Sequence, residues 1–353
     1  MRRRQATLLA ALTTAATALL TLGVTATGAS ASVGNGPGVS SRPLPYQVFA
    51  PYYEMYDTST DLASLSQQSG AKYLSLAFLQ TAAAGSCTAY WNGDATQPIA
   101  TSSYGTDIAA IQAHGGNVIP SFGGYSADTT GTEIADSCTS VPAIAAVYES
   151  LITTYNVPRI DMDVEADSLT NTAGINRRNE AIAMVEAWAA AHHRQIQFSY
   201  TMPTFPTGLT TAGLAVLQNA VADHAKIATV NIMTFDYYLG TQQDMVADTE
   251  SAAAGVFSQL QSLYPTAPAW ELWHTIGVTE MPGIDDFGTD ETFSTADANT
   301  ILHWARQQGI GMISFWALQR DNGGCPGTKG ANTCSGLTQP TWYFSHVFEH
   351  FTS

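Results

Sequence analysis

Charged residues are scarce in this chain of 353 residues: they make up 12% of it, against roughly 25% in an average soluble domain. The shortage falls on the basic side, because 13 Lys and Arg face 29 Asp and Glu and leave a formal net charge of -16. So few cations argue against a nucleic-acid-binding face and against binding to an anionic membrane surface. The hydrophobic content of 45% excludes global disorder. What remains is a folded protein with a neutral or cationic partner.

Hydrophobic runs of membrane-spanning length are also missing beyond residue 24, since a spanning helix needs roughly 18 such residues. Before that point, arginines at positions 2–4 precede an uncharged run over residues 6–24, and an Ala-Ser-Ala site follows at 29–31. This order predicts a cleaved secretory signal peptide over residues 1–31, and hence an extracellular protein. One alternative is a membrane helix, which the Thr and Gly in the run disfavour. Another is a twin-arginine signal, which only the adjacent arginines support.

Cysteine is rare as well, with four residues and no C-x-x-C pair. A metal site is therefore disfavoured. In an exported protein four cysteines allow three disulfide connectivities. Cys325 and Cys334 enclose a short Gly-rich loop, so their local pairing is the simplest choice. Cys87 and Cys138 would then pair across a longer span.

The rest of the chain alternates short apolar runs with longer segments of helical pattern. A Gly/Pro/Ser-rich lead over residues 32–45 predicts flexibility, and residues 46–353 predict the folded catalytic domain. The apolar runs are rich in β-branched and aromatic residues, as in parallel strands covered on both sides. They are Tyr46–Ala50, Tyr73–Phe78, Asn117–Phe122, Arg159–Glu165, Gln195–Thr201, Thr229–Phe235, Thr275–Val278 and Gly311–Trp316. The clearest predicted helices are Val141–Tyr155, Ile175–Ala191, Leu209–His224 and Ala296–Gln308.

Eight strand–helix units predict an α/β fold, a single-domain (β/α)8 TIM barrel. The competing fold is an open doubly wound sheet, which would usually carry a Gly-rich phosphate loop after its first strand. Here the first strand runs into Ala50-Pro51-Tyr52-Tyr53, which is no phosphate cradle. No composition shift marks a second domain, and no inserted α+β domain is obvious between the seventh and eighth strands.

Three acids at alternate positions, Asp161, Asp163 and Glu165, close the fourth predicted strand. Side chains alternate faces along a strand, so all three point into the barrel while the apolar residues between them face the helices. Their mutual repulsion and burial should raise the pKa of at least one. Such a carboxyl can stay protonated near neutral pH and act as a general acid. Glu165 stands last, at the strand end where barrel active sites lie. The alternative is an exposed acidic turn, which the interleaved apolar residues disfavour.

On these residues the sequence resembles glycoside hydrolase family 18, the chitinase family, whose fourth-strand signature is D-x-x-D-x-D-x-E. The last three acidic positions match, and Pro158 stands at the first. Two further family motifs, S-x-G-G on the third strand and M-x-Y-D-Y on the sixth, match residues 121–124 and 233–237, with Phe235 in place of the first Tyr. Trp316 matches the Trp that closes the eighth strand. Four motifs in the correct order cover nearly all of the chain after its leader.

The resemblance implies a substrate-assisted retaining mechanism, a known exception to the two-carboxylate scheme. Glu165 would protonate the glycosidic oxygen and later act as base for the incoming water. The 2-acetamido group of the substrate would serve as nucleophile, with Asp163 stabilising the oxazolinium ion. Asp161 would lie deeper and share a proton with Asp163. This mechanism requires neither a metal nor a cofactor, and we expect none.

The resemblance also implies a sugar site at the other strand ends. Trp316 would floor the subsite of the reacting sugar, since an aromatic face complements the C–H face of a pyranose. Asp236 and Tyr237 would hydrogen-bond the acetamido group or the distorted ring. Met233 and Met202 would line the pocket, and Tyr52 would line the cleft further out, with ordinary packing as the alternative for each.

Three functions fit these residues. The main hypothesis is a secreted, monomeric chitinase that hydrolyses β-1,4 bonds in chitin or N-acetylglucosamine oligosaccharides. An endo-β-N-acetylglucosaminidase acting on N-glycans would use the same acids. A non-catalytic sugar-binding barrel is the third possibility, although such relatives usually lose the terminal Glu that Glu165 represents.

Overall fold

The computed structural model describes residues 42–57 and 60–352. The predicted signal peptide and the lead up to Ser41 lie outside the described residues. The strands are β1 (Val48–Phe49), β2 (Tyr52–Glu54), β3 (Tyr73–Thr81), β4 (Ala89–Trp91), β5 (Asn117–Gly123), β6 (Arg159–Asp163), β7 (Gln197–Phe205), β8 (Gly208–Leu209), β9 (Thr229–Met233), β10 (Ile276–Glu280), β11 (Gly283–Ile284), β12 (Thr292–Phe293) and β13 (Met312–Phe315).

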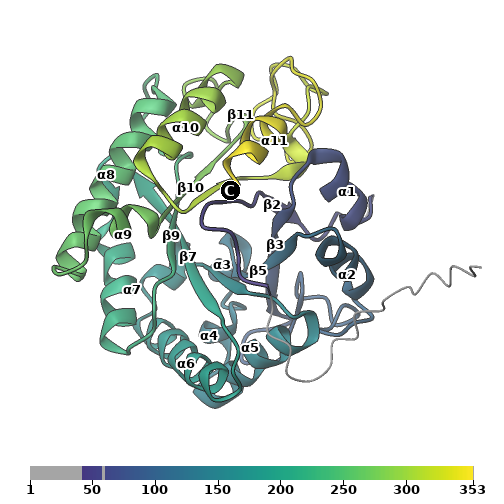
Figure 1. The fold of residues 1–353 in the computed structure, drawn as a ribbon, viewed down its shortest axis with the longest axis vertical. Helices are drawn as coiled ribbons and strands as arrows, with labels where there is room; N and C mark the ends of the chain where they lie inside the picture. Colours follow the sequence, from purple (N-terminus) through teal and green to yellow (C-terminus); the bar gives the residue numbers. More distant parts are fainter. Residues whose placement is uncertain (1–41, 58–59, 353) are drawn as a thin grey trace, which may run out of the picture. The chain divides into compact units, whose positions relative to one another are not determined.

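Helices surround these strands (Figure 1). They are α1 (Leu62–Ser69), α2 (Gly105–Ala113), α3 (Tyr125–Thr130), α4 (Ile134–Ser137), α5 (Val141–Tyr155), α6 (Thr172–Ala191), α7 (Thr211–Ala222), α8 (Met245–Leu263), α9 (Ala269–His274), α10 (Thr295–Gln308) and α11 (Tyr343–Phe348), with short 3-10 turns η1 (Ala166–Leu169), η2 (Leu318–Arg320) and η3 (Glu349–Phe351). The four helices expected from the sequence are all present, and α5 has the predicted bounds.

The predicted (β/α)8 barrel is confirmed. The sheet runs β1-β13-β10-β9-β7-β6-β5-β3-β2, and the neighbours along this path pair in parallel. Its two ends, β1 and β2, are halves of one barrel strand separated only by Ala50 and Pro51. Because β1 pairs with the last strand and β2 with β3, this first strand closes the ring.

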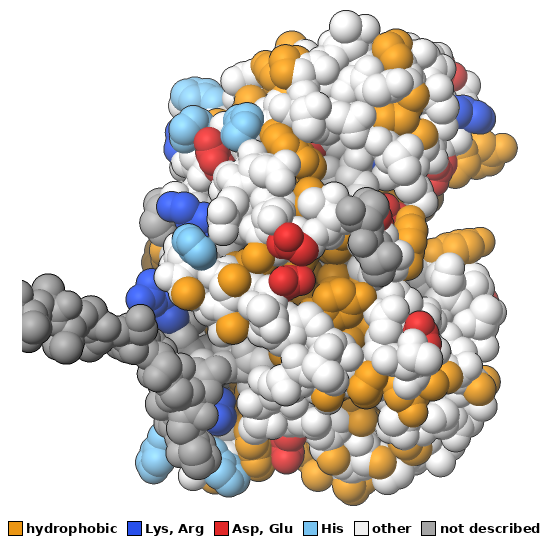
Figure 2. Space-filling view, turned by 90° about the vertical axis from the view of Figure 1, so that its right-hand side faces the viewer, with side chains coloured by type: hydrophobic (Ala, Val, Ile, Leu, Met, Phe, Trp, Pro, Cys, Tyr) orange, Lys and Arg blue, Asp and Glu red, His pale blue; other side chains and the backbone are white. Residues whose placement is uncertain are grey.

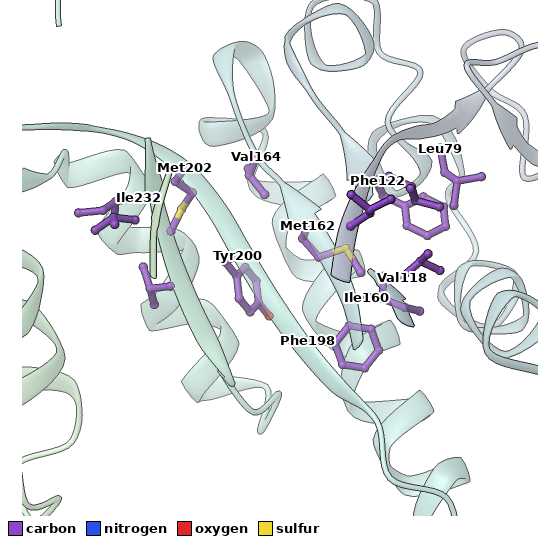
Figure 3. Packing of buried hydrophobic residues seen from close by; sticks show 14 of the residues in the cluster. Leu79, Val118, Phe122, Ile160, Met162, Val164, Phe198, Tyr200, Met202 and Ile232 are labelled. Atoms are coloured by element: carbon purple, nitrogen blue, oxygen red, sulfur yellow. The ribbon is translucent and has the colours of Figure 1, made fainter. Parts of the chain in front are cut away.

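Each barrel strand has one face that packs against the helices and one face that points into the barrel. Ile160 and Met162 on β6 and Val164 just after it point outward and pack beneath the helices, together with residues of β7 (Figure 3). The alternate residues point into the barrel, as the sequence pattern predicts. The connection from β10 to β13 holds only the small β11–β12 hairpin and α10, so the prediction that no α+β domain is inserted there is also confirmed.

Two disulfides join Cys87 to Cys138 and Cys325 to Cys334, with Cα atoms 4.7 and 5.9 Å apart. The simplest pairing predicted from the sequence is therefore the one in the structure. The first ties the loop after β3 to the end of α4. The second closes the loop that follows η2.

Candidate active site

A cavity of about 800 Å³ opens at the carboxyl ends of the barrel strands. A space-filling view shows a recess at the right-hand edge of the molecule, with hydrophobic side chains inside it (Figure 2). Residues from most strand ends line the cavity: Glu54, Tyr56, Ala77, Phe78, Gln80, Asn92, Gly123, Tyr125, Ser126, Ala127, Asp163, Glu165, Pro203, Thr204, Met233, Phe235, Asp236, Asp286, Phe287, Trp316 and Asn332.

Asp161 lies at the bottom of the acidic strand, held by four hydroxyl groups. Its register partners are Ser121 on β5 and Ser199 on β7, and both donate to its carboxylate, at 2.7 and 2.6 Å. Tyr52 and Thr201 also contact it, each at 2.9 Å. Burial raises the pKa of Asp161, and these hydrogen bonds oppose the rise. Four donors fill the lone pairs of an ionised carboxylate, so the site is built to hold Asp161 as an acceptor.

Asp163 is the next inward residue and lies at the cavity wall, 3% exposed. Within the described part of the chain its side chain makes no hydrogen bond, and its Oδ1 is buried without a partner. Burial, followed by the charges of Glu165, Asp161 and Asp128, holds the pKa of Asp163 well above its ordinary range. This carboxyl therefore has free hydrogen-bonding capacity directed at whatever occupies the cavity.

Glu165 follows β6 by two residues and borders the same cavity. Burial raises the pKa of its carboxyl to about 7, against a lowering hydrogen bond from the backbone N–H of Tyr125. A carboxyl with this pKa is protonated in a large fraction of molecules near neutral pH, which suits a general acid.

Close backbone approach accounts for the two glycines of the S-x-G-G motif. A Cβ on Gly123 would lie 2.1 Å from the carbonyl oxygen of Asp163, and one on Gly124 would lie 2.5 Å from the Phe78 ring. Both glycines also have positive φ, 99° and 83°. The motif therefore lets β5 pass close to the acidic strand, which gives its two glycines a structural role.

Aromatic rings form the apolar part of the cavity. Trp316 stacks on Phe78 with centroids 5.6 Å apart and planes 13° apart. Met233 and Phe235 contribute to another wall, beside Asp236. Burial and the neighbouring Asp286 raise the pKa of Asp236 to about 7. A site that combines aromatic faces with neutral or half-protonated acids suits an uncharged sugar ring.

Comparison with known proteins identifies the family. No family model matches the sequence. The chain is 32% identical, over 89% of its length, to the Escherichia coli (strain K12) protein named "Probable bifunctional chitinase/lysozyme", and covers 36% of that protein. It is 31% identical to "Endochitinase 11" of Metarhizium anisopliae over 80% of this chain and 54% of that protein. The chain thus spans between about a third and half of the curated relatives it matches.

The solved structures point the same way. Active domain 2 of a chitinase from Pyrococcus furiosus superposes with a TM-score of 0.77 at 29% identity, covering 90% of this chain and 97% of that one. The chain belongs to glycoside hydrolase family 18.

The structure brings most of the expected site residues together. Asp163, Glu165, Met233, Asp236 and Trp316 all border the cavity. Asp161 lies directly beneath Asp163 on the same strand face. No hydrogen bond joins the two carboxyls among the described contacts, so the predicted sharing of a proton between them stays a prediction.

Three expectations are corrected. Met202 does not line the cavity: because Thr201 faces inward, the next residue points outward and packs among the buried side chains beneath the helices (Figure 3). Tyr52 lies below the cavity, where its hydroxyl contacts Asp161 at 2.9 Å and Thr201 at 2.7 Å, and is not a wall of the outer cleft. Tyr237 is 2% exposed and packs in the core behind the Asp236 loop.

Sequence reasoning missed a polar wall made of Glu54, Tyr56 and Asn332. The Tyr56 hydroxyl donates to Glu54 at 2.5 Å and accepts from the Asn332 amide at 2.9 Å. Burial raises the pKa of Glu54 to about 7. Glu54 is an isolated acid, and Asn332 reaches the cleft from the loop closed by Cys325–Cys334, so no spacing signal could have found the pair.

Two further findings bear on the site. No group of three or more His, Cys, Asp or Glu within residues 42–57 and 60–352 is arranged to hold a metal ion. In the same part of the chain, no helix is both long and apolar enough to cross a membrane.

Proposed function

We propose that this chain is a secreted chitinase that hydrolyses β-1,4 bonds between N-acetylglucosamine units by substrate-assisted retaining catalysis. The observation that carries the proposal is the pair formed by Glu165, with a pKa raised to about 7, and Asp163, buried with an unpartnered oxygen, at one cavity wall. The family membership and the relatives named chitinases support the same reaction. A related Pyrococcus furiosus domain has been crystallised with chito-oligosaccharides, which supports such a ligand here.

Each acid has a role that follows from its surroundings. Glu165 donates its proton to the leaving glycosidic oxygen, because burial favours its protonated form. Asp163 bonds the acetamido N–H and stabilises the oxazolinium ion, since its Oδ1 has no protein partner. Asp161, held in place by four hydroxyls, lies beneath Asp163 and shares a proton with it. Trp316 supports the ring of the reacting sugar.

The decisive experiment compares the wild type with Glu165→Gln on a chromogenic chitobioside and on N-acetylglucosamine oligomers of defined length. The variant should lose hydrolysis, because an amide cannot donate the proton, and should keep oligomer binding in calorimetry. Unchanged turnover in Glu165→Gln would overturn the mechanism. Release of glycans from a high-mannose glycoprotein, with no cleavage of the oligomers, would favour the endo-β-N-acetylglucosaminidase. Binding without turnover in the wild type would favour the non-catalytic barrel.

Export and a monomeric state complete the proposal. The Ala-Ser-Ala site at residues 29–31 supports cleavage of the leader. The protein recovered from the culture medium should therefore begin at Ser32 in N-terminal sequencing and behave as a monomer in light scattering. Retention in the cell with an intact leader would contradict export.

A further inference from the structure

The short helix α3 contacts the segment that leaves β6 from two directions. The Asp128 side chain accepts a hydrogen bond through Oδ2 from the backbone N–H of Glu165 at 2.5 Å. The backbone N–H of Tyr125, one turn earlier on the same helix, donates to the Glu165 carboxylate. One helix therefore fixes both the main chain and the side chain of the general acid.

Asp128 occupies an unfavourable place for a carboxyl. It is 1% exposed, and its Oδ1 is buried without a hydrogen-bond partner among the described residues. The charged groups that face it are Glu133 at the start of α4, Arg178 on α6, and Asp163 and Glu165 at the end of β6. The guanidinium of Arg178 is engaged by Glu133 at 2.9 Å. Burial and the charge of Glu133 raise the pKa of Asp128 to about 8. An apolar residue here would avoid this cost, so packing alone does not explain the acid.

The backbone next to Glu165 needs an external restraint. Ala166 has a φ of 38°, in the left-handed region that residues with a Cβ adopt at a cost of about 1 to 3 kcal/mol. A relaxed main chain would rotate away from this conformation and carry the preceding side chain with it. The hydrogen bond from Glu165 N–H to Asp128 opposes that rotation.

We propose that Asp128 is a positioning residue, which holds the main chain at Glu165 so that the general acid faces the cavity beside Asp163. The inference rests on the proposed function, because it assigns Asp128 a part in that same reaction. Asp128 does not touch the reacting atoms. Its ionisation also adds a negative charge next to the two acids, so it influences the pH range over which they keep their protons.

The test compares Asp128→Ala, Asp128→Asn and the control Thr129→Ala, an exposed neighbour on α3. Asp128→Ala removes the acceptor and should lower kcat about 10- to 100-fold, with KM changed less than about twofold. Asp128→Asn keeps an oxygen acceptor and should therefore retain most of the wild-type kcat. It cannot ionise, so the alkaline limb of its pH profile should move to lower pH. Thr129→Ala should match the wild type.

A second readout does not depend on activity: the titration of Glu165, followed by NMR of carbon-13 in its carboxyl. The midpoint should move in both Asp128 variants and stay in place in Thr129→Ala. If kcat and the midpoint in the Asp128 variants equal those of Thr129→Ala, the inference is wrong. An inactive wild type would refute the proposed function, and the NMR comparison would still decide about Asp128. If Asp128→Ala fails to fold, Asp128→Asn decides through the Glu165 midpoint and the alkaline limb of its pH profile, both of which should differ from those of Thr129→Ala.

Discussion

Glu280→Gln should remove one large contribution to the pH dependence of stability. Glu280 ends β10 with 0% exposure, and its Oε1 accepts a hydrogen bond from the Thr249 hydroxyl at 3.0 Å. Its Oε2 is buried and has no hydrogen-bond partner in the part of the chain that the structure describes. Burial raises the pKa of Glu280 from 4.5 to about 8. The folded state therefore keeps a proton that the unfolded chain has released, so stability is full below pH 4.5 and falls as the pH rises towards 8. The loss is at most about 5 kcal/mol for this one group.

The assay is urea denaturation of the wild type and Glu280→Gln at pH 5 and pH 8. At pH 5 both side chains are largely neutral, and the two proteins should differ by about 1 kcal/mol or less, since the Gln oxygen can still accept from Thr249. At pH 8 the variant should be the more stable by several kcal/mol. Glu271→Gln, at an exposed position on α9, is the matched control and should show no such difference. If Glu280→Gln is less stable than the wild type at pH 8, by as much as at pH 5 or by more, the view that Glu280 is buried and neutral is refuted.

Other expectations concern catalysis. Asp161→Asn turns an amide towards hydroxyl donors and should destabilise the fold by about 1 to 3 kcal/mol while lowering kcat, measured by denaturation and steady-state kinetics; unchanged values would argue against the hydroxyl cradle. Trp316→Ala removes the ring stacked on Phe78 and should weaken oligomer binding by about 1 kcal/mol or more in calorimetry. Trp316→Phe keeps an aromatic ring and should retain part of that binding free energy. Because Glu165 must be protonated and its pKa is raised to about 7, kcat should fall above that pH in a pH–rate profile. A plateau up to pH 9 would contradict its role as general acid.

The acidic strand shows how much local pattern can predict. Alternation along Asp161–Glu165 places the acids inside and the apolar residues outside, and the structure has this arrangement. The same rule could have corrected Met202. The small hydroxyl residues Ser199 and Thr201 share the inward face of β7, so the larger residue next to them must point outward.

Residues that act from neighbouring loops could not be predicted in this way. Asp128 stands alone in its segment, without a partner at strand or helix spacing, and its burial depends on β5 and η1, which pack against α3. Glu54 gains its raised pKa from burial against a loop almost 280 residues later in the chain. Long-range packing determines such environments, and the hydrophobic periods of 2 residues in a strand and 3.6 in a helix do not reveal it.

The split first strand has a consequence for how the molecule is made. The neighbour of β1 in the sheet is β13, so β1 cannot pair until β13 has been synthesised. In addition, the Ser314 hydroxyl donates a hydrogen bond to the carbonyl of Ala50, 264 residues earlier in the chain. Near the C-terminus, the Thr352 hydroxyl accepts a hydrogen bond from the backbone N–H of Phe49. A chain still emerging from the ribosome therefore holds an open sheet with exposed edges, prone to pairing with other chains. Assembly of the active-site mouth must wait for the last strand, so the slowest step of folding should be closure of the ring.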